Sequence, residues 1–275
     1  MDSFYNFYTT KNGNLSKNLF DLFWVGRFQE AVSLFTPVVN AFGTIESLGM
    51  TDALIYLHCL SMTNSLQEAT FNFPEPPSKD EVLSLISYEI SQESKTYQGR
   101  LSSEKLLSQP RRLNKSLFAC QFGIEDNCKT AIETGTFLGS SSYIFSGVFE
   151  NVHTIEADFM LHQTSTFWLN SLRDNIKTYH GNSGEILSTL LTSAKESCLI
   201  FLDAHWSTGI TSKEYGICPL INELSSIFNS TYRHTIVIDD IRCMEMEGYP
   251  GFKEIFDTIP VGRSVQIEHD QMIIH

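Results

Sequence analysis

The chain has 275 residues, of which 42% are hydrophobic and 12% aromatic, and this composition excludes an intrinsically disordered protein. Its length allows one large domain, or one domain with a helical appendage, and a sizeable core. The chain has 32 acidic and 19 basic residues, which gives a formal net charge of -13. The average surface therefore repels nucleic-acid phosphates and anionic lipid. We therefore expect neither nucleic acid nor a membrane as a partner.

The cysteine pattern and the N-terminal residues bear on the cellular compartment. The 6 cysteines are scattered and form no C-x-x-C pair, which argues against a zinc knuckle or a disulfide framework and favours reduced thiols. The first residues lack the basic and apolar regions of a signal peptide, and no stretch approaches the roughly 18 apolar residues of a membrane span. A cytoplasmic protein is expected.

Residues 1–114 are expected to be helical. Apolar residues recur at helical spacing over residues 19–35, and Pro37 is expected to end this first helix. A second helix is predicted to start at Thr51 or Asp52. This third of the chain carries no recognisable chemical motif, so we predict a helical cap over the rest of the protein or, equally, an interface region that forms a homodimer.

Two further features lie towards the end of this region. Ser78 and Glu81 form the pattern of a capping box, which predicts that another helix begins there. The densest basic cluster comprises Arg111, Arg112 and Lys115, and it is expected to be a solvated linker.

From Lys129 onward, short β-rich runs alternate with helix-length segments. Five strands are predicted, over residues 130–133, 152–156, 178–180, 198–203 and 235–239. Such alternation predicts βαβ units and a parallel sheet, and the alternating tail from Ser264 to Ile274 predicts a closing antiparallel hairpin. The fold class is therefore α/β: a Rossmann-like doubly wound, mostly parallel sheet over residues 115–275, preceded by the helical region.

The first predicted strand leads into a glycine-rich turn, I-E-T-G-T-F-L-G-S-S, in which Thr136 and Ser140 follow the two glycines. In open α/β sheets, such a turn lets the backbone approach a ligand beyond the carboxyl ends of the strands. Gly135 and Gly139 have the spacing G-x-x-x-G, which differs from the dinucleotide fingerprint, and Glu133 suits an amino-bearing ligand. The turn favours the methionine part of S-adenosylmethionine over NAD, although a purely structural glycine turn explains it equally well.

The next two predicted strands end in further polar residues. Glu156 lies one βα unit after Glu133, where a carboxylate can accept both hydroxyls of a ribose; the alternative is an exposed acidic strand end. After the third strand comes H-G-N-S, in which Asn182 can bond the adenine amino group, beside Ser183, or simply form a turn.

The fourth and fifth predicted strands both end abruptly in acid. Asp203 follows the fourth, in F-L-D-A-H-W, and Asp239 and Asp240 follow the fifth, in V-I-D-D-I-R. At one sheet edge, three carboxylates repel one another unless a cation or a proton relieves them, and a divalent ion is the simplest relief. Alternatively, one acid caps a helix and another pairs with Arg242.

Taken together, these segments resemble the successive motifs of class I S-adenosylmethionine-dependent methyltransferases. Over residues 128–260, the chain is similar to the macrocin and catechol type of O-methyltransferase, and to uncharacterised bacterial methyltransferase-like proteins that contain L-D-x-H-[YW]-S, C-P-x-x-x-E-L and I-D-D-x-R. The resemblance implies a magnesium ion on Asp203, Asp239 and Asp240. It also implies an S-adenosylmethionine site, for which the candidate residues are Glu133, Gly135, Thr136, Gly139, Ser140, Glu156, Asn182, Ser183 and Asp203.

One position departs from the macrocin pattern. Those enzymes carry a second Asp two residues after the first metal ligand, proposed as the base, and this chain has His205 there. Histidine can serve as the base near neutral pH, ligate a metal or play a structural part. We expect His205 and Asp203 to be catalytic in a methyl transfer to a hydroxyl of a small-molecule acceptor. A metal-dependent sugar-nucleotide transferase, or a degenerate methyltransferase fold used as a binding module, are the alternatives.

Overall fold

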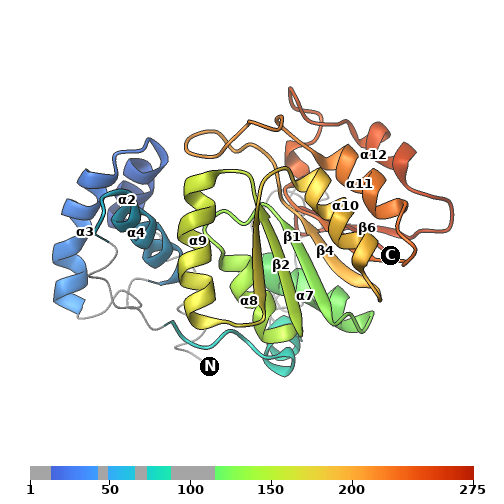
Figure 1. The fold of residues 1–275 in the computed structure, drawn as a ribbon, viewed down its shortest axis with the longest axis horizontal. Helices are drawn as coiled ribbons and strands as arrows, with labels where there is room; N and C mark the ends of the chain where they lie inside the picture. The colour runs from blue at the N-terminus through green and yellow to red at the C-terminus, as the bar shows by residue number, and fades with distance from the viewer. Residues whose placement is uncertain (1–13, 43–48, 66–72, 88–114) are drawn as a thin grey trace, which may run out of the picture.

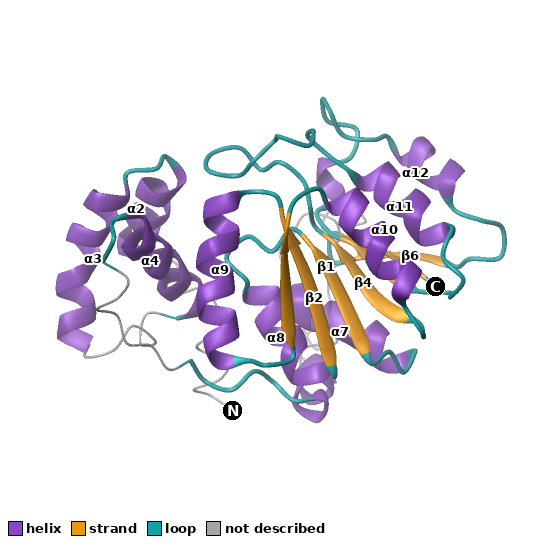
Figure 2. Cartoon of the chain, in the orientation of Figure 1, coloured by secondary structure: helices purple, strands orange, loops and turns teal. Residues whose placement is uncertain are grey.

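The computed structural model describes residues 14–42, 49–65, 73–87 and 115–275. Its centre is one seven-stranded sheet with the order β3-β2-β1-β4-β5-β7-β6 (Figures 1 and 2). The strands are β1 (Thr130–Thr134), β2 (Asn151–Glu156), β3 (Ile176–His180), β4 (Cys198–Leu202), β5 (Thr235–Ile238), β6 (Val265–Glu268) and β7 (Gln271–Ile274).

The first five strands run parallel, and β7 pairs antiparallel with both β5 and β6. The predicted α/β fold with a closing antiparallel hairpin is therefore confirmed. Strand order reverses at β1, which pairs with β2 on one side and β4 on the other. In such sheets, the crevice beyond the carboxyl ends of the strands at this switch point is where ligands bind.

Helices cover both faces of the sheet, as Figures 1 and 2 show. One face carries α7 (Lys115–Glu125), α8 (Ser140–Val148) and α9 (Phe159–Leu172), and the other carries α10 (Ser183–Ser193), α11 (Leu220–Phe228) and α12 (Phe252–Thr258). In β4, Leu199 and Phe201 join the first core and Ile200 and Leu202 the second. Because alternate side chains of a strand point to opposite faces, an unbroken apolar strand is what a two-sided core requires.

The helical region contains α2 (Asn14–Trp24), α3 (Phe28–Phe42) and α4 (Met50–Met62), which pack together beside α9 (Figure 1). The prediction of one helix over residues 19–35 ending at Pro37 was wrong. The chain breaks at Gly26, whose φ of +75° suits glycine, and α3 continues through Pro37. Packing of α3 on α4, including a 2.8 Å hydrogen bond between the hydroxyls of Thr36 and Tyr56, offsets the backbone bond that proline cannot make.

Two other local predictions for this region, the second helix and the capping box, are confirmed. The second predicted helix is α4, which starts slightly earlier than expected. The capping box forms: the Ser78 amide donates to the Glu81 carboxylate at 2.9 Å, and helical residues 79–87 follow. Of the basic cluster, Arg111 and Arg112 lie outside the described residues. Among the helices that the structure describes, none is long and apolar enough to cross a bilayer.

Candidate active site

A cavity of about 290 Å³ lies at the carboxyl edge of the sheet. Its walls come from the glycine turn after β1, the end of β2, the start of α10, and the loop of residues 203–219 between β4 and α11. Helix α2 adds Phe20 and Trp24 to the wall, so part of the helical region reaches this cavity. We call it the edge cavity.

Close packing explains both glycines of the turn. Gly135 has a φ of +85°, and a Cβ there would overlap the backbone carbonyl of Asp203. Gly139 has a φ of +88°, and a Cβ there would lie 2.9 Å from the ring of Trp168. Gly135 lines the edge cavity and Gly139 does not. The structural explanation is therefore sufficient for Gly139, while Gly135 also brings backbone to the cavity wall.

Glu133 lies behind the wall rather than on it. Its side chain is buried, with only 1% of the residue exposed, and accepts hydrogen bonds from the hydroxyls of Ser142 and, at 2.7 Å, Thr154. Burial raises the pKa of Glu133 to about 7, against the opposing effect of these hydrogen bonds. The expected direct contact with a ligand amino group is thus not supported, because the carboxyl is occupied inside the core.

Glu156, in contrast, lines the edge cavity. Its two carboxylate oxygens accept the backbone amides of Phe137, at 2.7 Å, and Asp158, at 2.8 Å. Burial raises its pKa to about 7, although these amide hydrogen bonds favour the charged form. The amides fix the carboxylate at the mouth of the turn, and each oxygen keeps a further lone pair for a ligand hydroxyl.

The remaining predicted cofactor residues divide in the same way. Asn182 caps α10 by accepting the Gly184 amide at 2.9 Å and is not on the wall, so its turn interpretation holds, whereas Ser183 lines the cavity. Thr136 is buried and bonded to Thr154, and Ser140 begins α8; neither reaches the cavity. The predicted cofactor residues that line it are Gly135, Glu156, Ser183 and Asp203.

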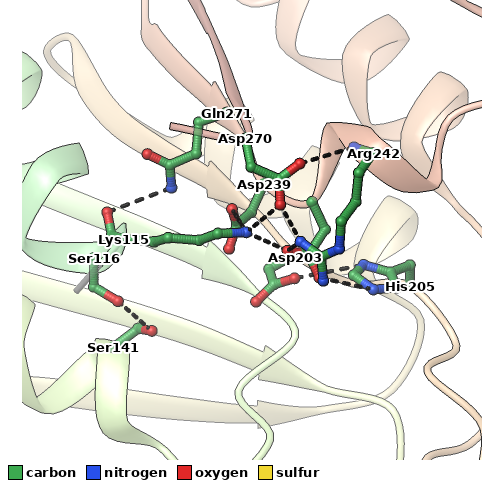
Figure 3. A network of polar contacts seen from close by, with 10 residues as sticks. Lys115, Ser116, Ser141, Asp203, His205, Asp239, Arg242, Asp270 and Gln271 are labelled. Atoms are coloured by element: carbon green, nitrogen blue, oxygen red, sulfur yellow. Dashed lines mark hydrogen bonds and ion pairs between the residues drawn. The ribbon is translucent and has the colours of Figure 1, made fainter. Parts of the chain in front are cut away.

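The acids after β4 and β5 do meet at this edge (Figure 3). The amides of Asp203 and Asp239 continue the sheet ladder by donating to Thr134 and Leu202, both at 3.0 Å. Asp270, in the turn between β6 and β7, joins them through a shared lysine partner. We call Asp203, Asp239, Asp240 and Asp270 the acidic edge.

Lys115, the first residue of α7, supplies the positive charge at the acidic edge (Figure 3). Its ammonium lies 2.8 Å from Asp239, 2.8 Å from Asp270 and in contact with Asp240. Arg242 contacts Asp240 and Asp270 as well. The expectation of a solvated linker was wrong for Lys115, because the fold brings this residue onto strand ends more than a hundred positions away in the sequence.

These contacts shift the acids in different directions. Burial opposes ionisation of Asp240, but hydrogen bonds from Lys115 and Arg242 outweigh it and lower its pKa. Burial raises the pKa of Asp239 to about 6 despite the attraction of Lys115. Burial, followed by the charges of Asp239 and Asp240, raises the pKa of Asp203 well above its ordinary value.

His205 lies between two of these acids. Its Nδ1 is 3.4 Å from Asp203 and its Nε2 is 3.5 Å from Asp240, both longer than a normal hydrogen bond. The side chain is 10% exposed, and burial lowers its pKa although Asp240 favours the charged form. A neutral imidazole on the wall of the edge cavity can accept a proton.

The residues with ligand atoms close enough to share a metal ion differ from the predicted set. Within the described parts of the chain, one group qualifies: His205, Asp240 and Cys243 each offer a ligand atom, and these atoms lie within 4.8 Å of one another. Asp240 is the one member shared with the predicted triad of acids.

Sequence reasoning missed several residues at this site. Three aromatic residues line the edge cavity: Phe20, Trp24 and Trp206. Nothing in the sequence indicated that they belong to a site, apart from the spacing of one helical turn between Phe20 and Trp24. Lys115 had no signal as a partner for the acids. Glu223, from the C-P-x-x-x-E-L segment, is 1% exposed, and burial raises its pKa to about 7, so that segment supplies a buried acid on α11.

Comparisons with known proteins give distant structural likenesses. No protein-family model and no curated protein matches the chain. An O-methyltransferase from Bacillus cereus in complex with SAH is 14% identical, with 72% of this chain and 90% of that chain covered and a TM-score of 0.43. SAH-bound methyltransferase PaMTH1 from Podospora anserina is 13% identical, with 74% and 99% covered and a TM-score of 0.43. O-methyltransferase TomG from Streptomyces achromogenes, in complex with SAM, is 14% identical, with 72% and 89% covered and a TM-score of 0.42.

Proposed function

We propose that this protein is an S-adenosylmethionine-dependent methyltransferase that acts on a hydroxyl group of a small molecule. The observation that carries the proposal is the edge cavity itself. It lies at the switch point of a doubly wound sheet, between a glycine turn and two carboxylates, Glu156 at the end of β2 and Asp203 directly after β4, the two strands that flank β1. Ligands of such sheets bind at this point.

The side chains on the wall of the edge cavity favour a cofactor without phosphate groups. Glu156, Asp203 and Asp240 line the edge cavity, and none of the described residues that line it is a lysine or an arginine. The diphosphate of NAD or of a sugar nucleotide would find no cationic side chain on this wall, whereas S-adenosylmethionine has no phosphate that needs one. The same contrast disfavours the sugar-nucleotide transferase alternative.

Three groups would hold the cofactor. The carboxylate of Glu156 would accept ribose hydroxyls, the hydroxyl of Ser183 lies at the start of α10, and Gly135 brings the chain backbone to the cavity. Bound there, S-adenosylmethionine would supply an electrophilic methyl group.

His205 would act on the acceptor. Its imidazole would take the proton that the acceptor hydroxyl loses as its oxygen becomes an ether, and Asp240, whose pKa is lowered, would stabilise the imidazolium that forms. A positioned base of this kind contributes roughly a hundredfold or more in rate. The loop of residues 203–219 and the rings of Phe20 and Trp24 would exclude water from the reacting groups.

Magnesium, which the resemblance implies, does not fit the acids as they are arranged. Asp239 and Asp240 direct carboxylate oxygens at the ammonium of Lys115, and Arg242 holds Asp240 as well. No step of the proposed reaction is therefore assigned to a metal ion.

Calorimetry with S-adenosylhomocysteine, UDP-sugars and NAD tests the proposal. We expect micromolar binding of S-adenosylhomocysteine alone, and Glu156→Ala should weaken it by about tenfold or more through lost charge-assisted hydrogen bonds. Glu150→Ala, an exposed acid before β2, is the matched control and should change nothing. Binding of a UDP-sugar in place of S-adenosylhomocysteine would support the transferase alternative, and binding of none of the three would favour a binding module.

A further inference from the structure

The ammonium of Lys115 lies where a divalent ion on the acidic edge would have to bind. It forms ion pairs with Asp239 and Asp270 at 2.8 Å each and a third with Asp240 (Figure 3). These carboxylates come from the end of β5 and from the turn between β6 and β7, so a single side chain bridges two neighbouring segments of the sheet edge.

The local structure holds Lys115 in this place. It is the first residue of α7, and its backbone carbonyl accepts the side-chain amide of Gln271 at 3.4 Å. The next residue, Ser116, donates its hydroxyl to Ser141 of α8 at 2.6 Å (Figure 3). The N-terminal turn of α7 is thus bonded to both β7 and α8, and the lysine side chain, 31% exposed, extends across the acids.

The neighbouring carboxylates keep this lysine protonated. Burial by itself disfavours the ammonium, but the attraction of Asp239 and the hydrogen bonds to the acids outweigh it, and the pKa of Lys115 is raised. Arg242 adds a second fixed cation against Asp240 and Asp270. A divalent ion bound by Asp239 and Asp240 would therefore lie beside an ammonium and a guanidinium, and like charges at such distances repel strongly.

We propose that Lys115 is the internal counter-ion of the acidic edge, and that it takes the place of a divalent metal ion. It is a positioning residue, because its ion pairs fix the carboxylates of Asp239 and Asp240 next to Asp203 and His205. Lys115 itself does not line the edge cavity. Asp240 also belongs to the group with His205 and Cys243, so the same ammonium blocks ion binding there. This proposal goes beyond the proposed function and does not depend on which cofactor binds.

Manganese binding provides the test, followed by the loss of the electron paramagnetic resonance signal of the free ion. We expect the wild-type protein to leave millimolar Mn²⁺ free, and Lys115→Met to bind one ion per chain at least tenfold more tightly. Adding Asp239→Asn to Lys115→Met should abolish this gain, because the ion would lose a ligand. Lys129→Met, the same change at a lysine that is 58% exposed, is the matched control and should stay silent.

A second readout separates a counter-ion from a merely structural lysine. Millimolar Mg²⁺ should raise the melting temperature of Lys115→Met and leave that of the wild type unchanged, since only the variant has uncompensated acids. If Lys115→Met does not fold, Lys115→Gln carries the same two measurements. One Mn²⁺ bound by the wild type and lost in Asp239→Asn would overturn the proposal, as would a folded Lys115 variant that binds no better than wild type. Neither measurement involves S-adenosylhomocysteine, so this proposal can fail while the proposed function stands.

Discussion

The two halves of the sheet edge stabilise their strand-end acids in different ways. At β1 and β2, Glu133 and Glu156 are held by neutral donors, namely hydroxyls and backbone amides, and burial raises the pKa of each to about 7. At β5 and the β6–β7 turn, Asp240 and Asp270 are held by the cations Lys115 and Arg242, and the pKa of Asp240 is lowered. Carboxyl groups at one sheet edge thus have pKa values shifted in opposite directions, as for Glu156 and Asp240, according to the partners that the fold provides.

This difference has a functional consequence. The half near β2 lines the cavity with a carboxylate whose partners are backbone groups that cannot leave, so it presents a rigid acceptor to a ligand. At the acidic edge, Lys115 and Arg242 already form ion pairs with Asp239, Asp240 and Asp270, so these carboxylates do not require an external cation. Substitutions that remove a cationic partner at the acidic edge and substitutions at the glycine turn should therefore change the stability of the protein by different amounts.

The largest expected effect is at the acidic edge. Lys115→Met should lower the free energy of unfolding by about 3 kcal/mol, because removing one partner of a largely buried ion pair leaves charges without compensation. Urea denaturation measures this loss. Lys129→Met should cost less than about 1 kcal/mol, since its pair with Glu150 is solvent-exposed at 3.5 Å. Equal losses in the two variants would contradict the role given to Lys115.

A somewhat smaller effect is expected at the glycine turn. Gly135→Ala should cost about 2 kcal/mol, because its φ of +85° disfavours a side chain and the added Cβ would overlap the Asp203 backbone. Gly262→Ala is the matched control: its φ is +93° and nothing lies within 4 Å of the added atom, so only the conformational cost of about 1 kcal/mol remains. Thermal or urea unfolding compares the two. If Gly262→Ala proved the more costly, close packing would not be the reason for Gly135.

The last expected effect appears only as the pH changes, and it concerns Glu133. Its pKa rises from an ordinary 4.5 to about 7 on folding, so the folded state binds the proton more tightly, and this contribution to stability is lost as pH rises from about 4.5 to about 7. Glu133→Gln, which stays neutral, should be close to the wild type in stability at pH 5 and more stable than the wild type at pH 8. Melting curves across this range provide the measurement, and parallel pH profiles for the two proteins would count against a neutral Glu133.

The strands of the sheet could be predicted from the sequence pattern. Short apolar runs such as Cys198–Leu202 indicated strands buried on two faces, and their alternation with helix-length segments predicted the parallel sheet. The alternating tail from Ser264 to Ile274 predicted the closing hairpin. The helical region was harder to divide, because its apolar spacing runs on across Gly26 and Pro37. There, the packing of α3 on α4 decided where the helices begin and end.

The sequence by itself therefore determined which polar residues end the strands, since a carboxylate directly after an apolar run must lie at the sheet edge. Only the tertiary structure decided which of them face a ligand. Glu133 and Glu156 have similar surroundings in the sequence, yet one is enclosed beneath α8 and the other lines the cavity. Lys115 could not be assigned from sequence at all, because its partners lie 124, 125 and 155 positions further along the chain. The pairing exists only in the folded protein, where α7 packs beside β5 and the ammonium of Lys115 lies within reach of the carboxylates.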